Sequence, residues 1–190
     1  MSYQIDKYVR TVDWFLGSAL KQRAMDFLNQ KEKNTILEIG SYEGLSACYF
    51  SDLFLEHPES RLICVDPFDV SDITTPLTTK TEIYCRENIN KSHGKEKVTI
   101  CKTYSDDYFK NNQLHFNFVY IDGSHVPSQI TRDMENCWKY LDKGGIMWMD
   151  DYLGGTGGHI KAAMDGFLRN HTNEFTIVYN AYQLALKKLI

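Results

Sequence analysis

Acidic side chains and a histidine that could do chemistry follow two apolar runs of the chain. Asp122 and His125 come directly after residues 116–121, and the pair Asp150-Asp151 comes after the next such run. If both runs are strands of one parallel sheet, their carboxyl ends lie at the same edge, and these side chains meet there. Two carboxylates about 4 Å apart repel each other by roughly 4 kcal/mol at an effective dielectric near 20. Such a cluster therefore raises carboxyl pKa values or binds a cation.

A divalent-cation site is the more specific interpretation of these acids. Ligands that offer only oxygen, as Asp122, Asp150 and Asp151 do, suit Mg²⁺, or Mn²⁺ or Ca²⁺, rather than zinc. His125, with an ordinary pKa near 6.5, could take the proton of a hydroxyl group at the same place. The alternative for each residue taken alone is a capping aspartate or an exposed loop histidine.

A glycine loop after the first apolar run predicts a cofactor site. Glu38 lies near the end of this run, and Gly40 and Gly44 follow in a G-x-x-x-G spacing that differs from the G-x-G-x-x-G of nicotinamide and flavin folds. Asp66 ends the second run, where a carboxylate can accept hydrogen bonds from ribose hydroxyls, and Phe68 could pack near an adenine. Ordinary turn glycines and a capping aspartate are the alternative explanation.

The elements that must position these residues alternate along the chain. Apolar runs alternating with helical patterns predict an α/β fold, a doubly wound and mostly parallel seven-stranded sheet. The last two runs are too close for a crossover helix and must form an antiparallel hairpin. The predicted strands are 35–39, 61–65, 98–101, 116–121, 146–149, 175–179 and 183–189. The predicted helices are 44–55, 80–91, 106–111, 128–141 and 160–169, with a loop over 70–79.

The ends of the chain and its length complete this outline. Residues 1–190 suit a single domain. Apolar residues from Trp14 to Leu28 recur at helical spacing and predict one amphipathic helix over about residues 8–30, within an N-terminal helical segment 1–33. Gly144-Gly145 is expected to end the helix before the fifth strand. Exposed apolar surface around Trp14 would suit a homodimer.

The composition limits the partners and the compartment. A formal net charge of −4 argues against a protein that coats nucleic acid. The five cysteines are widely spaced and form no C-x-x-C pair, so neither a disulfide framework nor a zinc site is indicated. The N-terminus has no apolar signal core, and no stretch reaches about 18 apolar residues. We expect a soluble cytoplasmic protein without a membrane partner.

Two segments resemble the motifs of class I S-adenosylmethionine methyltransferases. ILEIGSYEGLSACYF is similar to their first motif, and LICVDPF is similar to their second. The resemblance implies that Gly40, Ser41 and Gly44 hold the amino-acid part of the cofactor and that Asp66 holds its ribose. It also implies that Glu38 fixes the loop through backbone amides or reaches the cofactor's ammonium group. Ser105, after the third strand, would contact the adenine.

A third segment resembles small-molecule O-methyltransferases related to the macrolide sugar enzymes. The segment YIDGSHVPSQITRDMENCWKYLDKGGIMWMDDY matches their D-G-x-H and paired D-D-Y pattern, and catechol-type enzymes have a comparable spacing. The resemblance implies metal ligation by Asp122, Asp150 and Asp151, a further cofactor contact by Asp122, and a general base at His125, where the catechol-type enzymes have a lysine. Pro127 and Ser128 depart from the pattern, which has an aromatic residue there.

The predicted activity is S-adenosylmethionine-dependent methylation of a small-molecule hydroxyl, with a divalent cation assisting. Polar segments at 69–79 and 154–159 favour a sugar or the end of a glycan as acceptor. Tyr152 or Trp148 could stack on it, and a place in the core is the favoured alternative for Trp148. Two alternatives stay open. One is a nicotinamide-dependent oxidoreductase, disfavoured by the glycine spacing and the hairpin, and the other is a non-catalytic cofactor-binding domain of a larger glycan-synthesis protein.

Overall fold

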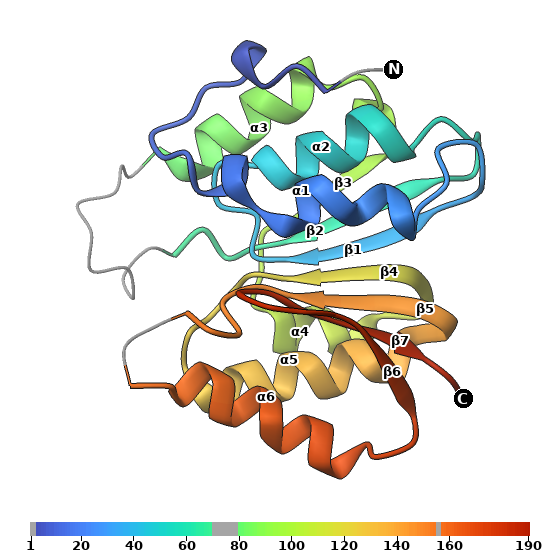
Figure 1. Cartoon of the computed structure of the whole chain (residues 1–190). Coiled ribbons are helices and arrows are strands. Elements are labelled where there is room, and N and C mark those ends of the chain that lie inside the picture. Colours follow the sequence, from blue (N-terminus) through green and yellow to red (C-terminus); the bar gives the residue numbers. More distant parts are fainter. Residues whose placement is uncertain (1–2, 70–79, 155–156) are drawn as a thin grey trace.

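The central element of the molecule is one seven-stranded sheet (Figure 1). A computed structural model describes residues 3–69, 80–154 and 157–190. The strand order is β3-β2-β1-β4-β5-β7-β6, so the chain crosses over between β3 and β4 and the sheet is doubly wound. The strands are β1 (Thr35–Ile39), β2 (Arg61–Val65), β3 (Val98–Cys101), β4 (Phe116–Ile121), β5 (Leu141–Met149), β6 (Phe175–Asn180) and β7 (Leu184–Lys188).

The pairing confirms the predicted mixture of directions. The first five strands are parallel to one another, with Ile39 of β1 opposite Val65 of β2 and Ile121 of β4. The last strand, β7, lies between β5 and β6 and is antiparallel to both. The parallel strands β1, β2, β4 and β5 thus end at one edge, which is where the predicted site residues follow them.

Alternating side chains of the strands fill two separate cores. On one face, Ile36 and Phe118 pack beneath α1, α2 and α3, and on the other face Leu37 and Val119 pack against α5 and α6. Figure 1 shows these two helix groups on opposite sides of the sheet. Strands with both faces covered need apolar residues at successive positions, which is why the runs were recognisable in the sequence. The helices are α1 (Ala19–Arg23), α2 (Leu45–Phe54), α3 (Thr81–Lys91), α4 (Ser105–Asn111), α5 (Pro127–Tyr140) and α6 (His159–Asn170).

The single helix predicted over residues 8–30 is wrong. The segment instead forms the 3₁₀ turn η2 (Trp14–Gly17), the short α1 and the 3₁₀ turn η3 (Ala24–Asp26), after an earlier turn η1 (Ile5–Lys7). Ser18 between η2 and α1 has extended backbone angles, with φ −61° and ψ 135°. Phe15, Leu20 and Leu28 of this segment are buried, whereas Trp14 is exposed. Short turns carry these residues instead of one continuous helix, because Gly17 and Ser18 interrupt the helical backbone.

The helix end predicted at Gly144-Gly145 is also wrong. The helix α5 ends at Tyr140, and β5 begins at Leu141, so both glycines lie inside a strand. Gly144 has a φ of +82°, and the β4–β5 register shifts between Phe116 and Phe118 beside it. The glycines thus accommodate an irregularity in the pairing of β4 and β5, and they do not cap a helix.

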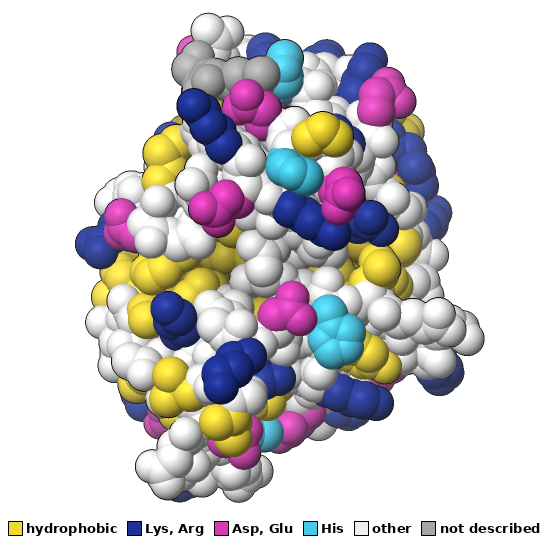
Figure 2. All heavy atoms as spheres, turned by 90° about the vertical axis from the view of Figure 1, so that its right-hand side faces the viewer, with side chains coloured by type: hydrophobic (Ala, Val, Ile, Leu, Met, Phe, Trp, Pro, Cys, Tyr) yellow, Lys and Arg dark blue, Asp and Glu magenta, His cyan; other side chains and the backbone are white. Residues whose placement is uncertain are grey.

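The end of the molecule opposite the site carries charges of both signs (Figure 2). Basic, acidic and histidine side chains are interspersed there around a band of hydrophobic side chains.

Across the described parts of the chain, every helix is too short or too polar to span a bilayer. The predicted loop over 70–79 lies outside the described residues.

Candidate active site

The glycine loop between β1 and α2 packs directly against the end of β4. Gly40 has a φ of +85°, and a Cβ atom added there would lie 2.0 Å from the carbonyl oxygen of Asp122. Gly44, with a φ of +79°, would place a Cβ 3.0 Å from the Sγ of Cys85 on α3. Glycine is therefore required at position 40 by a neighbouring strand end, and not only by the approach of a ligand. The same contact joins the predicted cofactor loop to the predicted reaction site.

Asp66, after β2, holds this loop in place. Its Oδ2 accepts hydrogen bonds from the backbone N–H groups of Ser41, at 2.7 Å, and Tyr42, at 2.8 Å. Its Oδ1 accepts the N–H of Phe68 at 2.6 Å. The sequence predicted a ribose ligand at this position. In the structure Asp66 orders the loop. The residue is half-buried, and its Oδ1 has one lone pair left for a further donor.

Glu38 is fully buried beneath the loop with one oxygen unpaired. The hydroxyl of Ser41 donates to its Oε2 at 2.5 Å, while Oε1 has no hydrogen-bond partner. Burial raises the pKa of Glu38 to about 7. A buried oxygen without a donor is costly and indicates a missing cationic or N–H group. Glu38 therefore fits the ammonium group of an amino-acid cofactor, which was one of its two predicted roles. In the other predicted role Glu38 would bind the backbone amides of the loop, but two of these amides bind Asp66.

Phe68 and Ser105, the two residues predicted near the adenine, follow β2 and β3 and pack against different helices. Phe68 packs against the core that includes α2 and α3, with a φ of +54°. Ser105 begins α4 and donates its hydroxyl to Asp133 at 2.5 Å, and Gln129 contacts both residues. The Ser105 side chain is thus committed to the α4–α5 contact, and its predicted adenine contact remains untested.

Tyr120 lies between two of the three aspartates at the strand ends. Its hydroxyl is 2.8 Å from Oδ2 of Asp122 and 2.6 Å from Oδ2 of Asp150. A hydroxyl group carries one proton and donates to one carboxylate at a time, so the second contact requires a proton on a carboxyl group. Tyr120 precedes Asp122 by two positions on β4, and the period of a strand places both on the same face. Sequence reasoning missed Tyr120, although this spacing could have indicated it.

The third aspartate faces the histidine. Asp151 has a φ of +55°, and its Oδ2 lies 2.9 Å from Nε2 of His125. The hydroxyl of Tyr182 donates to Oδ1 of the same carboxylate. The His125 side chain is 63% exposed, so its other ring nitrogen is open to an incoming molecule. A carboxylate that binds one imidazole nitrogen and leaves the other free is the arrangement of a general base and its orienting group.

The pKa values at this edge differ in direction. The pKa of Asp122 is raised, first because protein atoms around its carboxyl group displace water and then because Asp150 repels its charge. The residue as a whole is nevertheless exposed to solvent. Burial raises the pKa of Asp150 as well. The hydrogen bond from His125 lowers the pKa of Asp151, and the same bond raises the pKa of His125. The pKa shifts thus favour protonation within the pair Asp122 and Asp150 and ionisation of Asp151 beside His125.

The carboxylates of the three aspartates are held by hydrogen bonds to other side chains. Protein donors already bind the carboxylates of Asp150 and Asp151, and Asp151 turns toward His125. In the described part of the chain, no group of three or more His, Cys, Asp or Glu side chains is arranged to hold a metal ion. Metal ligation by Asp122, Asp150 and Asp151 therefore stays a prediction, and no step below is routed through a cation.

Aromatic side chains other than the predicted ones face solvent near this edge. Trp148 is fully buried, in agreement with the core position expected for it. Tyr152 is nearly buried, so the stacking suggested for it is wrong. Tyr182 is 54% exposed beside Asp151, and Trp14 is 60% exposed with its ring centroid 5.3 Å from that of Tyr42 in the glycine loop. The exposed aromatic surface of the site thus comes from segments that the sequence did not single out for this role.

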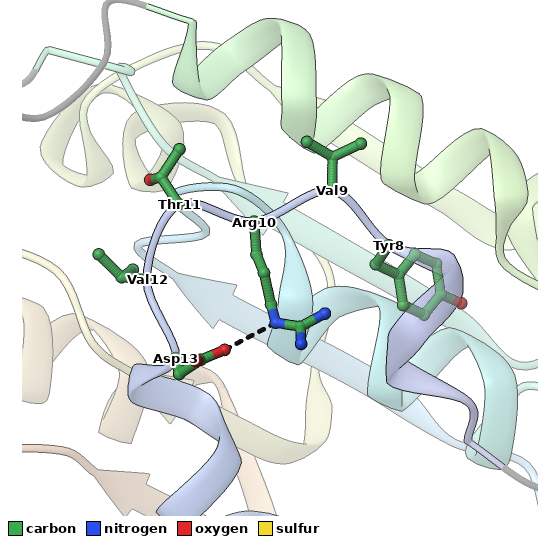
Figure 3. A pocket seen from close by; sticks show the side chains of 6 residues that line it. All are labelled: Tyr8, Val9, Arg10, Thr11, Val12 and Asp13. Atoms are coloured by element: carbon green, nitrogen blue, oxygen red, sulfur yellow. Dashed lines mark hydrogen bonds and ion pairs between the residues drawn. The ribbon is translucent and has the colours of Figure 1, made fainter.

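The N-terminal segment forms an arch before it reaches Trp14 (Figure 3). Residues 8–13 line a hollow of about 430 Å³, and Arg10 Nε is bonded to Asp13 Oδ1 within it at 2.7 Å. Thr11 anchors the arch to the glycine loop by donating its N–H and hydroxyl to Glu43. A smaller cavity of about 20 Å³ lies among the strand-end residues, including Asp122, His125 and Asp151. It has room for little more than a water molecule, so larger ligands must bind at the open edge.

Comparison with known proteins gives one family match. Residues 37–152 match the model of a family described as a methyltransferase domain. An uncharacterised protein of Acanthamoeba polyphaga mimivirus is 28% identical over 129 residues, which are 65% of this chain and 53% of that protein. The chain therefore spans about half the length of this curated relative.

Solved structures with the same fold are distant in sequence. A protein from Clostridium thermocellum, described as a candidate rRNA methylase, aligns with a TM-score of 0.70 at 18% identity, over 95% of this chain and 99% of that one. An O-methyltransferase from Bacillus cereus, solved with S-adenosylhomocysteine, aligns with a TM-score of 0.61 at 13% identity, over 97% and 95% of the two chains. At these identities the likeness establishes the fold.

Proposed function

Because this chain belongs to the methyltransferase-domain family, we propose that it is an S-adenosylmethionine-dependent O-methyltransferase acting on a small-molecule hydroxyl. The observation that carries the proposal is the exposed His125, bonded to Asp151 at the same sheet edge as the glycine loop. The loop and the base belong to one site, since Gly40 packs on the carbonyl of Asp122 three residues before His125.

The cofactor would be held by the residues around the glycine loop. Glu38 would accept the ammonium group through its unpaired Oε1, and the loop from Gly40 to Gly44 would hold the carboxylate end. Asp66 would keep the loop ordered and offer its remaining lone pair to the ribose, near Phe68. When bound, S-adenosylmethionine supplies an activated methyl group on a sulfonium.

His125 would take the proton of the acceptor hydroxyl. Its Nε2 faces Asp151, so the neutral ring carries its proton on Nε2 and presents the lone pair of Nδ1. His125 would accept the acceptor's proton at Nδ1 while the acceptor oxygen takes the methyl group, whose bond to the sulfonium sulfur breaks to leave the neutral thioether, and Asp151 would stabilise the resulting imidazolium. General-base assistance of this kind contributes about 10²–10⁴ in rate.

Divalent-cation assistance by Asp122, Asp150 and Asp151 remains a separate part of the proposal. The sequence pattern supports Mg²⁺, whereas the hydrogen bonds of these carboxylates to protein donors do not require an ion. Turnover in excess EDTA tests it. Full activity in EDTA removes the cation from the reaction, and loss of activity restored by Mg²⁺ establishes it.

A sugar or a glycan end is the proposed acceptor. Exposed aromatic rings bind the apolar faces of sugars, and both Trp14 and Tyr182 offer such rings near the open edge. The similarity of the third sequence motif to the macrolide sugar enzymes supports the same class. We place the reaction in the cytoplasm, where the thiols of Cys48, Cys64 and Cys85 would stay reduced.

Two experiments test the proposal. The thermal unfolding midpoint should rise with S-adenosylhomocysteine and not with NAD, and the reverse would favour an oxidoreductase. His125→Ala should then lower kcat on a responsive sugar by about 10²–10⁴, with the affinity for S-adenosylhomocysteine unchanged. His115→Ala, at another exposed histidine, is the matched control. Cofactor binding without methyl transfer to any hydroxyl would favour a non-catalytic domain.

A further inference from the structure

Gln183 is a buried polar residue with no part in the mechanism above. It lies just before β7 and is 2% exposed. Its amide group contacts two segments that are far apart in the sequence: the N-terminal residues Ser18 and Leu20, and the end of β5 at Trp148 and Asp150. A polar side chain surrounded by several partners in a buried position indicates a specific role.

The orientation of the Gln183 amide is fixed by chemistry. Its Oε1 lies 2.9 Å from the backbone nitrogen of Leu20 and 2.9 Å from Nε1 of Trp148. Both of these groups are donors only, so the oxygen of the amide must face them. The Nε2 must then point in the opposite direction, toward Asp150.

The Nε2 of Gln183 donates to Oδ2 of Asp150 at 2.7 Å. The same carboxylate also receives the hydroxyl of Tyr120 at Oδ2 and the N–H of Asp151 at Oδ1. Gln183 is thus one of three donors that determine how Asp150 is turned at the site. Of these three, it is the one that also contacts the N-terminal segment, through Leu20 and Ser18.

We propose that Gln183 is a positioning residue of the reaction site, which orients Asp150 and links it to Ser18 and Leu20 of the N-terminal segment. The inference rests on the proposed methyl transfer. The N-terminal segment runs from Thr11, bonded to Glu43 near the glycine loop, to Ser18, bonded to Gln183. It therefore spans the edge where the acceptor binds, and Gln183 fixes its far end to the acid pair.

A double-mutant cycle tests whether Gln183 acts through Asp150. Gln183→Met removes the amide while keeping the length of the side chain, and Asp150→Ala removes the carboxylate that accepts its hydrogen bond. We expect Gln183→Met to lower kcat about tenfold, as the loss of one hydrogen bond to a charged group predicts. In the Asp150→Ala background the same substitution should have no further effect on kcat. Losses that multiply, or a kcat of Gln183→Met equal to wild type, would overturn the proposal.

Three controls separate positioning from general damage. The affinity of Gln183→Met for S-adenosylhomocysteine should stay within about twofold of wild type, and a loss matching that in kcat would contradict the proposal. Gln113→Met, at an exposed glutamine, should leave kcat unchanged. If Gln183→Met does not fold, Gln183→Leu replaces it in the cycle.

A measurement without any acceptor separates this inference from the proposed function. The N–H of Asp151 donates to Oδ1 of Asp150 at 2.8 Å, so its hydrogen exchange reports the orientation of that carboxylate. Exchange of this amide should be about tenfold faster in Gln183→Met, and an unchanged rate would overturn the role of Gln183. If the wild-type protein methylates no hydroxyl at all, the proposed function fails, and this exchange rate still decides on Gln183.

Discussion

At the scale of single residues, the buried carboxyl of Glu38 makes the stability of the free protein depend on pH. Its pKa is about 7 in the folded protein, against about 4.3 in an unfolded chain. A raised pKa stabilises the folded state below the unfolded value, and this contribution is lost as the pH rises through the folded value. The loss is on the order of 3 kcal/mol between pH 4 and pH 8.

Glu38→Gln should remove this dependence. The neutral amide has nearly the same shape, so without ligand the variant should be more stable than wild type at pH 8 and similar to it at pH 5. Urea unfolding at the two pH values measures the difference, and a difference independent of pH contradicts the assignment. The same substitution should weaken S-adenosylhomocysteine binding at pH 8, because the ammonium group loses its carboxylate partner.

The bond between His125 and Asp151 predicts the pH profile of turnover. Asp151 raises the pKa of His125, and the base must be neutral to accept a proton, so kcat/KM should rise with pH through a value above about 6.5. Asp151→Asn removes the negative charge and should move this rise toward lower pH while lowering kcat. A profile that stays in place in Asp151→Asn would show that another group is the base.

The residue types of the site were readable in the sequence, whereas their partners were not. Acids after two apolar runs placed Asp122, Asp150 and Asp151 at one edge, because parallel strands end together. Which carboxylate pairs with His125 depends on the left-handed backbone of Asp151, and no local pattern announces that conformation. The role of Gln183 depends on a contact with Leu20, 163 positions earlier in the chain.

At the scale of elements, the turn from β1 into α2 should tolerate no side chain at Gly40. An alanine there would combine a φ of +85° with a Cβ 2.0 Å from the carbonyl of Asp122. Gly144 has a similar φ of +82° with open space around its Cβ position, which makes Gly144→Ala a matched control for backbone strain alone. We expect the control to lose about 1–2 kcal/mol of unfolding free energy and Gly40→Ala to lose clearly more, together with cofactor binding. Equal losses in urea unfolding would show that the β1–β4 contact is unimportant.

Strands and helices were predictable to different degrees for a physical reason. The buried strands are near-continuous apolar runs, and most of their limits follow from composition alone, as for Thr35–Ile39. The N-terminal segment has helical spacing too, but Gly17 and the extended Ser18 break it, and Leu20 finds its hydrogen-bond acceptor on Gln183. Spacing reports which residues pack inward, and tertiary partners decide which backbone conformation carries them.

At the scale of the whole molecule, a histidine far from the active site joins three elements of the C-terminal half. His171, at the end of α6, contacts Glu135 of α5 through Nε2 at 3.0 Å and Glu174, before β6, through Nδ1 at 2.8 Å. Both ring nitrogens face carboxylates, so the protonated ring satisfies both contacts. Although burial opposes it, the bonds to Glu174 and Glu135 raise the pKa of His171.

The charged form of His171 should therefore stabilise the fold in acid. Its contribution is complete below the unfolded pKa of about 6.5 and is lost as the pH rises through the higher folded value. His171→Phe keeps a ring against Phe167 but removes both ion pairs, so wild type should exceed it by on the order of 1 kcal/mol in unfolding free energy at pH 6 and by less at pH 9. His115→Phe, at an exposed histidine 3.5 Å from its acid, should change stability by under about 0.5 kcal/mol at either pH. A deficit of His171→Phe that is equal at pH 6 and pH 9 would mean that ring packing, and not charge, joins α5, α6 and β6.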